Sequence, residues 1–107
     1  MSDDVCEVIV TAPDAEWLAE FTRRLVDDRL AAAGQTVAPI RSVYRWQGQM
    51  YDKPEARVAL HTRRSLVPYI VDRTNREHPY EVPCVAAMTF DGNPAYVQWV
   101  LDETIAP

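Results

Sequence analysis

Two hydrophobic periodicities alternate along this chain, and their order restricts the fold more than any other feature. Residues 6–12, CEVIVTA, form a β-branched run that is typical of a strand. The run stops at TAPD, where Thr11 and Asp14 have capping-box spacing. From Asp14 to about Ala33 the apolar residues recur at helical spacing, and Gly34 is a natural helix terminator. The sequence therefore predicts a strand that leads directly into a helix.

Four further segments follow, each with its own pattern. They are two strands within residues 36–62 joined as a hairpin near Gly48 to Pro54, a helix capped by Ser65, a strand over residues 84–90, and a short helix started by Asn93 and Pro94. The second helix must end near His78, because Pro79 cannot continue it.

This order, β-α-β-β-α-β with a C-terminal helix, predicts an α+β fold of the ferredoxin-like, split βαβ type. We expect an antiparallel sheet with strand order 4-1-3-2 and helices on one face. A chain of 107 residues with 48% hydrophobic content fits one domain, residues 1–107.

Charge and hydropathy restrict the partners of such a domain. The net charge is -5 at pH 7 with a pI near 4.9, which opposes binding to phosphate backbones. No segment approaches the roughly 20 apolar residues of a membrane span, and the N-terminus lacks the basic and long apolar regions of a signal peptide. We therefore expect a soluble, cytoplasmic protein that binds neither nucleic acid nor membranes.

Aromatic residues on the predicted second strand and third helix indicate an interface. Tyr44 and Trp46 share one strand face, and Tyr96 and Trp99 lie on the C-terminal helix. This is more aromatic surface than a small monomer usually exposes, and such patches usually mark contacts between proteins. Self-association is the simplest explanation.

The stretch EHPYEVPC, residues 77–84, contains the candidate metal ligands His78, Glu81 and Cys84. Copper and zinc prefer imidazole and thiolate, and Cys84 should lie beside the end of the first strand. One hypothesis is a His, Cys and carboxylate site for copper or another divalent cation, within one subunit or across a subunit boundary. The alternative is structural: the prolines bend the chain, His78 bonds a backbone carbonyl, and Cys84 fills the core.

The other histidine and cysteine are placed apart from this stretch. His61 closes the third strand at the opposite end of the sheet from His78. Cys6 begins the first strand, about 16 Å from Cys84 at the usual rise per residue. A disulfide needs Cα atoms within about 7 Å, so both thiols are predicted to be free.

Several motifs, taken in order, resemble one known family. They are VTAPD at 10–14, RLAAAGQ at 29–35, SVYRWQGQM at 42–50, Glu55, HT at 61–62, HPYEVP at 78–83 and YVQW at 96–99. Together they resemble the CutA family of divalent-cation-tolerance proteins. The resemblance is collinear and covers nearly the whole chain.

The resemblance implies a ferredoxin-like subunit in a compact homotrimer, in which the long second and third strands wrap the neighbouring subunits. It also implies a link to copper and other divalent ions. Copper-binding members look as though they use a Cys just before the Thr-Ala-Pro-Asp motif and a His pair just before Pro-Tyr. This chain has Val10, Glu77 and His78 at those positions, so only His78 is retained.

Two other classes of function are the alternatives. A small ferredoxin-like enzyme could form a pocket between subunits from Glu55, Tyr44, Trp46 and Tyr80, but no nucleophile–base pair stands out. A ligand-sensing trimer similar to the PII proteins would need a long loop between strands two and three and a Gly-rich phosphate site, which this sequence lacks. The favoured interpretation is a non-enzymatic trimer for divalent-cation tolerance.

Overall fold

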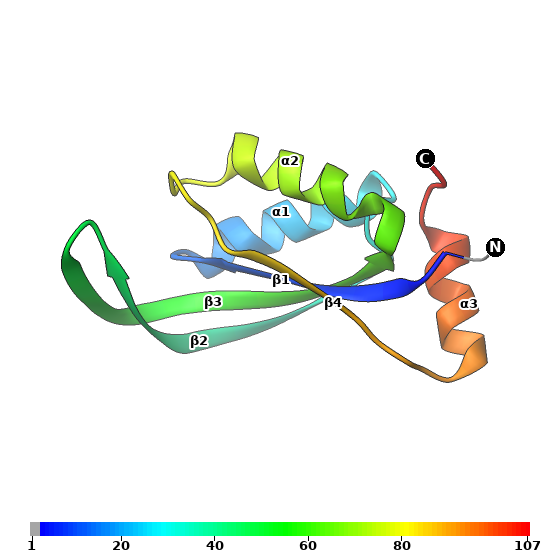
Figure 1. The fold of residues 1–107 in the computed structure, drawn as a ribbon, viewed down its shortest axis with the longest axis horizontal. Coiled ribbons are helices and arrows are strands. Elements are labelled where there is room, and N and C mark those ends of the chain that lie inside the picture. Colours follow the sequence, from blue (N-terminus) through cyan, green and yellow to red (C-terminus); the bar gives the residue numbers. More distant parts are fainter. Residues whose placement is uncertain (1–2) are drawn as a thin grey trace.

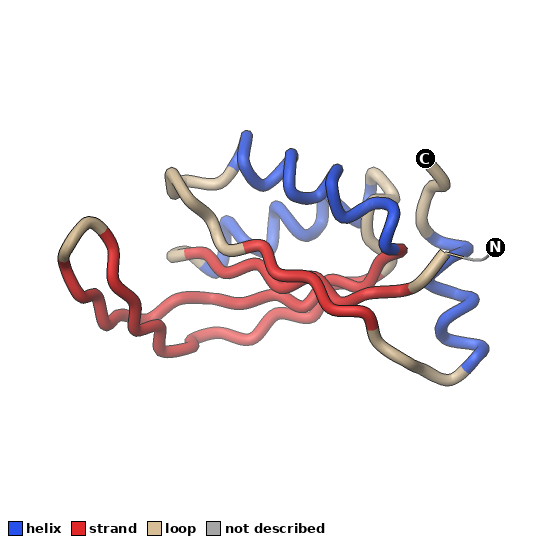
Figure 2. Tube along the Cα trace, in the orientation of Figure 1, coloured by secondary structure: helices blue, strands red, loops and turns tan. Residues whose placement is uncertain are grey.

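The computed structural model describes residues 3–107 and contains four strands and three α-helices in that range (Figures 1 and 2). In chain order the elements are β1 Val5–Ala12, α1 Ala15–Asp27, β2 Ala33–Trp46, β3 Gln49–Arg63, a 3-10 turn Arg64–Leu66, α2 Val67–Glu77, β4 Val85–Thr89 and α3 Pro94–Glu103. The predicted order of elements is confirmed.

The four strands form one antiparallel sheet in the order β2-β3-β1-β4. This is the strand order expected from the sequence, read from the opposite edge. The central strand β1 pairs with β3 from Val5 opposite Arg63 to Ala12 opposite Ala56, and with β4 from Cys6 opposite Thr89 to Val10 opposite Val85. The start of β4 therefore lies beside the end of β1.

Helices α1 and α2 lie side by side on one face of the sheet, as Figure 1 shows. Alternate residues of a strand point to one face, and on β1 Val8 and Val10 point toward these helices. They pack against Leu18, Phe21 and Leu25 of α1 in a fully buried core. Helix α3 differs from the expectation of one covered face, because it lies at the end of the sheet (Figure 1).

The first helix is shorter than predicted. It ends at Asp27 because Arg29 turns to a left-handed φ of 61°, and the amides of Leu30 and Ala31 both donate to the Leu25 carbonyl. Gly34 does not terminate the helix and lies instead in β2, where an added Cβ would stand 2.4 Å from the Thr22 side chain. Its small size allows the strand and helix to approach closely.

The N-terminal caps of the first two helices differ from the predicted ones, which were Thr11 in a capping box with Asp14, and Ser65. Asp14 caps α1 itself, because its side chain accepts a hydrogen bond from the Glu16 amide at 2.9 Å. Ser65 lies in the 3-10 turn before α2, and Leu66 occupies the cap position with no side-chain hydrogen bond. The predicted end of α2 is confirmed, because His78 is its C-terminal cap residue.

The β2–β3 hairpin is longer and more tightly closed than predicted. Its turn is only Gln47 and Gly48, with φ values of 50° and 80°, so Pro54 lies within β3. Positive φ at both central residues is typical of the two-residue hairpin turn whose backbone twist matches the twist of the flanking strands. Because β1 covers β3 only as far as Ala56, the closed end of the hairpin projects beyond the sheet and helices (Figure 1).

The C-terminal segment is anchored at the opposite end of the sheet. Arg63 at the end of β3 donates from Nε to the Thr104 hydroxyl at 3.0 Å, and the Ile105 amide donates to the Arg29 carbonyl at 3.0 Å. Val100 of α3 packs with Val5 in a second small core. Of the helices in residues 3–107, none has the length and apolar composition to cross a membrane.

Candidate functional site

A groove of about 500 Å³ lies between the projecting part of the hairpin and the loop from α2 to β4. Four of the five residues predicted for an interface or pocket line it, namely Tyr44, Trp46, Glu55 and Tyr80. Glu81 and Cys84, predicted as metal ligands, lie on its rim and are exposed. The remaining residue, Trp99, is not in this groove; it is 41% exposed on α3, where its ring stacks on Tyr96 at 5.6 Å.

The pairing of β2 with β3 places the aromatic residues of the groove on one face. Tyr44 pairs with Tyr51, and Ser42 pairs with Lys53, so these side chains point the same way. The rings of Tyr44 and Tyr51 are stacked, with centroids 5.2 Å apart and an interplanar angle of 14°. The hairpin therefore supplies an aromatic wall.

Glu55 is a buried carboxylate at the base of the groove, with only 6% of its surface exposed. Its Oε2 accepts a hydrogen bond from the Tyr80 hydroxyl at 2.6 Å. Burial, with a contribution from this Glu55 bond, raises the pKa of Tyr80 to about 12. A phenol held in its protonated form is a hydrogen-bond donor and a poor general base at neutral pH.

Lys53, like Tyr51, is a residue of this groove that the sequence analysis missed. Its Nζ lies 5.0 Å from the ring centroid of Tyr80, 5.7 Å from that of Tyr44 and 5.9 Å from that of Tyr51. The phenol groups of Tyr80 and Tyr44 hold the pKa of Lys53 above its usual value. The signal in the sequence is that Tyr51, Lys53 and Glu55 alternate along one strand and so share a face.

His78 is hydrogen-bonded to the backbone through both ring nitrogens. It is 8% exposed, and its Nε2 lies 2.7 Å from the Thr11 carbonyl oxygen at the end of β1. Its Nδ1 accepts a hydrogen bond from the Tyr80 amide at 2.9 Å. A carbonyl only accepts and an amide only donates, so the neutral ring carries its proton on Nε2 and both nitrogens are occupied. The ring of Trp17 packs edge-on at 5.1 Å.

The three predicted metal ligands do not form a metal-binding group within one chain. No cluster of three or more His, Cys, Asp or Glu side chains that could hold a metal ion occurs in residues 3–107. His78 points inward to Thr11, whereas Glu81 and Cys84 face the open groove. A single chain thus offers a thiol and a carboxylate at the groove, without the His78 imidazole.

Both cysteines are free, as predicted. Cys6 is buried in the core, and burial raises the pKa of its thiol. Cys84 is exposed just before β4, beside the end of β1. The expectation that Cys84 would fill the core is therefore wrong, since its thiol is accessible.

His61 lies at the other end of the sheet from His78, as predicted. Its Nε2 is 2.8 Å from Glu7 Oε2, and its Nδ1 is 2.5 Å from the Tyr96 hydroxyl. Burial, with the nearby Glu7 charge, raises the pKa of Tyr96. These contacts join β1, β3 and α3, which is a structural role.

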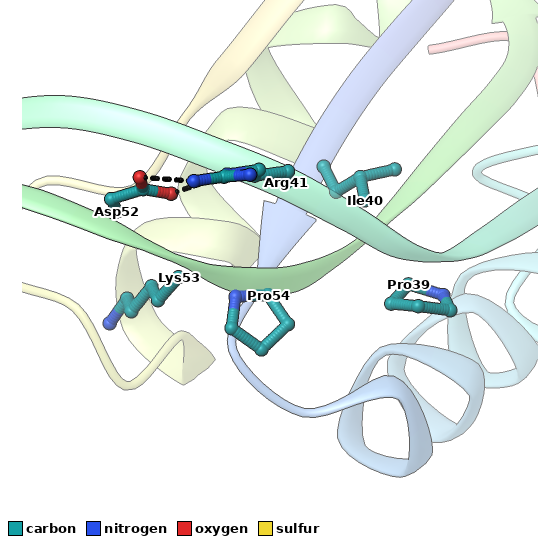
Figure 3. A pocket seen from close by; sticks show the side chains of 6 residues that line it. All are labelled: Pro39, Ile40, Arg41, Asp52, Lys53 and Pro54. Carbon is teal, nitrogen blue, oxygen red and sulfur yellow. Dashed lines mark hydrogen bonds and ion pairs between the residues drawn. The ribbon is translucent and has the colours of Figure 1, made fainter.

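A second hollow of about 420 Å³ lies along the hairpin near the cis peptide bond before Pro39 (Figure 3). Arg41 and Asp52 form a two-pronged ion pair there, with N to O distances of 2.8 and 2.7 Å. The Arg41 guanidinium lowers the pKa of the Asp52 carboxyl. This pair joins β2 to β3 close to a register shift between Val37 and Ile40.

Replacing Tyr80 with Phe is expected to destabilise the protein by about 1 to 3 kcal/mol at pH 7, because Glu55 loses its donor and stays buried. Since folding raises the pKa of Tyr80, its phenol stabilises the fold below about pH 10, and this contribution is lost as the pH rises through about 12. Urea unfolding at each pH measures both effects. Tyr69→Phe on the exposed surface of α2 is the control, and an equal effect of both substitutions would contradict the account.

The known proteins that this chain is similar to include divalent-ion tolerance proteins and proteins called CutA. Its fold is similar to that of CutA1 from Oryza sativa, with a TM-score of 0.94 and 29% identity over 99% of this chain and 98% of that one. It is similar to the divalent cation tolerance protein from Thermus thermophilus, with a TM-score of 0.89 and 32% identity over 94% of this chain and 98% of that one. The chain thus has the fold of the CutA1 structures.

Sequence similarity identifies the particular family. Residues 6–103 match the family described as CutA1 divalent ion tolerance protein. The chain is 33% identical to the divalent-cation tolerance protein CutA of Thermus thermophilus over 91% of this chain and 95% of the relative. It is 37% identical to the human protein CutA over 94% of this chain, but spans only 56% of that relative's length. The chain belongs to the CutA1 divalent ion tolerance family.

Proposed function

We propose that this chain acts in divalent-cation tolerance as a non-enzymatic homotrimer with a ferredoxin-like subunit. The observation that carries the proposal is the family match over residues 6–103. The groove supports a binding role over catalysis, because Tyr80 is held protonated and Glu55 is already bonded to it. Neither the enzyme nor the PII-like alternative gains support from the relatives, which are described in terms of divalent-ion tolerance or simply as CutA.

Exposed apolar side chains on the hairpin support the homotrimer. Val43 is 60% exposed and Met50 is 70% exposed, on the face opposite the groove. Val37, also exposed, lies on the same edge strand, β2. A projecting strand with a free edge and apolar side chains is a surface that monomeric proteins usually avoid. A cyclic trimer would cover it with neighbouring subunits.

Copper or another divalent cation is the proposed ligand, held weakly. The exposed Cys84 thiol and the exposed Glu81 carboxylate are the accessible donors at the groove, and thiolate is the softer ligand. Metal sites usually have three or four protein ligands, so water or a second subunit would have to supply the remaining ligands.

Calorimetric titration of the purified protein with copper and zinc tests this mode of binding. We expect saturable binding in the micromolar range or weaker, which Cys84→Ala weakens further and Glu16→Gln on the surface of α1 leaves unchanged. Tight binding in the nanomolar range, or binding that Cys84→Ala does not alter, would contradict the proposed weak site at the groove rim.

A further inference from the structure

Only one of the two carboxylate oxygens of the buried Glu55 has a hydrogen-bond partner within residues 3–107. Tyr80 bonds its Oε2, and no other hydrogen bond or ion pair to this carboxylate occurs within residues 3–107. Across the same range, Thr22 Oγ1 is the one fully enclosed side-chain N or O atom without a partner. Glu55 Oε1 is therefore not fully enclosed, and Glu55 lines the groove.

Lys53 supplies an unpaired positive charge beside this carboxylate. Its ammonium is surrounded by the rings of Tyr80, Tyr44 and Tyr51, and within the described chain it forms no ion pair with a carboxylate. An ammonium among aromatic rings keeps its charge, since ring faces stabilise cations. The groove is thus lined by a cation, Lys53, and a buried anion, Glu55, and neither forms an ion pair within residues 3–107.

Lys53 and Glu55 lie close enough to serve one small ligand. Lys53 and Glu55 are two residues apart on β3, so their Cα atoms lie about 6.6 Å apart and their side chains share a face. Both contact Tyr80, so they approach the same region. An α-amino acid carries its ammonium and carboxylate on one carbon, so both groups could be met at once.

The rest of the groove favours an apolar side chain on such a ligand. The stacked rings of Tyr44 and Tyr51 and the indole of Trp46 form one wall. Small-molecule sites are lined predominantly by hydrophobic and aromatic side chains, which suit an apolar group on the ligand. A groove of about 500 Å³ is large enough for a small metabolite.

We propose that this groove binds a zwitterionic α-amino acid with an apolar or aromatic side chain, with the ammonium at Glu55 and the carboxylate at Lys53. This inference is independent of metal binding, because it uses neither Cys84 nor Glu81.

Calorimetric titration of the metal-free protein with three probes tests the proposal. L-phenylalanine carries both charges, N-acetyl-L-phenylalanine lacks the ammonium, and L-phenylalaninamide lacks the carboxylate. We expect L-phenylalanine to bind and each derivative to bind at least about tenfold more weakly, because each loses one charge-assisted hydrogen bond. No binding of L-phenylalanine, or equal binding of a derivative, would overturn the proposal; equal binding of the N-acetyl form would indicate an anion site.

Two substitutions test which residue binds the ammonium of the ligand and which binds its carboxylate. Glu55→Gln keeps an acceptor for Tyr80 and should remove the preference for L-phenylalanine over its N-acetyl form. Lys53→Met should remove the preference over the amide. Glu16→Gln and Arg76→Met, at exposed positions on α1 and α2, are the matched controls and should change neither preference. Unchanged preferences in both groove variants would overturn the assignment of the two charges. If a variant fails to fold, titration of the wild-type protein with the three probes still tests the site.

Discussion

His78→Ala is expected to lower the free energy of unfolding by about 3 to 5 kcal/mol, because it leaves two polar groups without partners. The Thr11 carbonyl and the Tyr80 amide both bond the imidazole, and the ring also packs on Trp17. Through these hydrogen bonds the His78 side chain links the end of β1 to the loop that follows α2. Urea unfolding of the variant, compared with Asn75→Ala on the exposed face of α2, measures the effect.

A comparison of the wild-type protein with His78→Ala also separates a structural role of His78 from a role as a metal ligand. If the role is structural, a chelator changes the stability of the wild-type protein little, and copper affinity is the same in wild type and His78→Ala. A wild-type protein that loses stability in a chelator, down to the level of the variant, would instead identify His78 as a ligand.

Val43→Asp is expected to convert the proposed trimer into single subunits of 12.2 kDa. Val43 lies on the outer face of the hairpin and is 60% exposed in one chain, so a charge there costs little in the monomer. In an interface the same carboxylate would be buried without a partner, which costs several kcal/mol. Light scattering gives the mass directly.

The control for this substitution is Tyr69→Asp, which places the same charge on an exposed aromatic residue of α2, away from the hairpin. Tyr69→Asp should keep the trimer. A Val43→Asp variant that keeps the wild-type mass would show that the hairpin face is not the interface, and a wild-type mass of 12.2 kDa would reject the trimer itself.

The sequence predicted the strand order of this fold better than its helix ends and its hairpin turn. Alternation along β1 and β3 is a strong periodic signal, so the pairing of the start of β4 with the end of β1 followed from topology. The end of α1 depends on Arg29 adopting a left-handed conformation that few non-glycine residues adopt. Gly34 misled the prediction because its role is close packing against Thr22, which depends on tertiary structure.

The candidate site was predicted in part. Tyr44, Trp46, Glu55 and Tyr80, which were predicted for a pocket between subunits, all line one groove of the single chain, and their role there stays a prediction. The orientation of His78 could not be derived from its neighbours in sequence, because its partner Thr11 is 67 residues away. Lys53 was overlooked because a lone lysine in a strand is usually solvated. Its position near three tyrosine rings depends on the pairing of β2 with β3 and on the loop that carries Tyr80.

The most direct test of the role in divalent-cation tolerance is the growth limit of a strain from which this gene has been removed, on graded copper and zinc. We predict that the deletion strain stops growing at a lower metal concentration than its parent, and that the wild-type gene restores the limit while the Val43→Asp form does not. A deletion strain that tolerates the same copper and zinc concentrations as its parent would contradict the account.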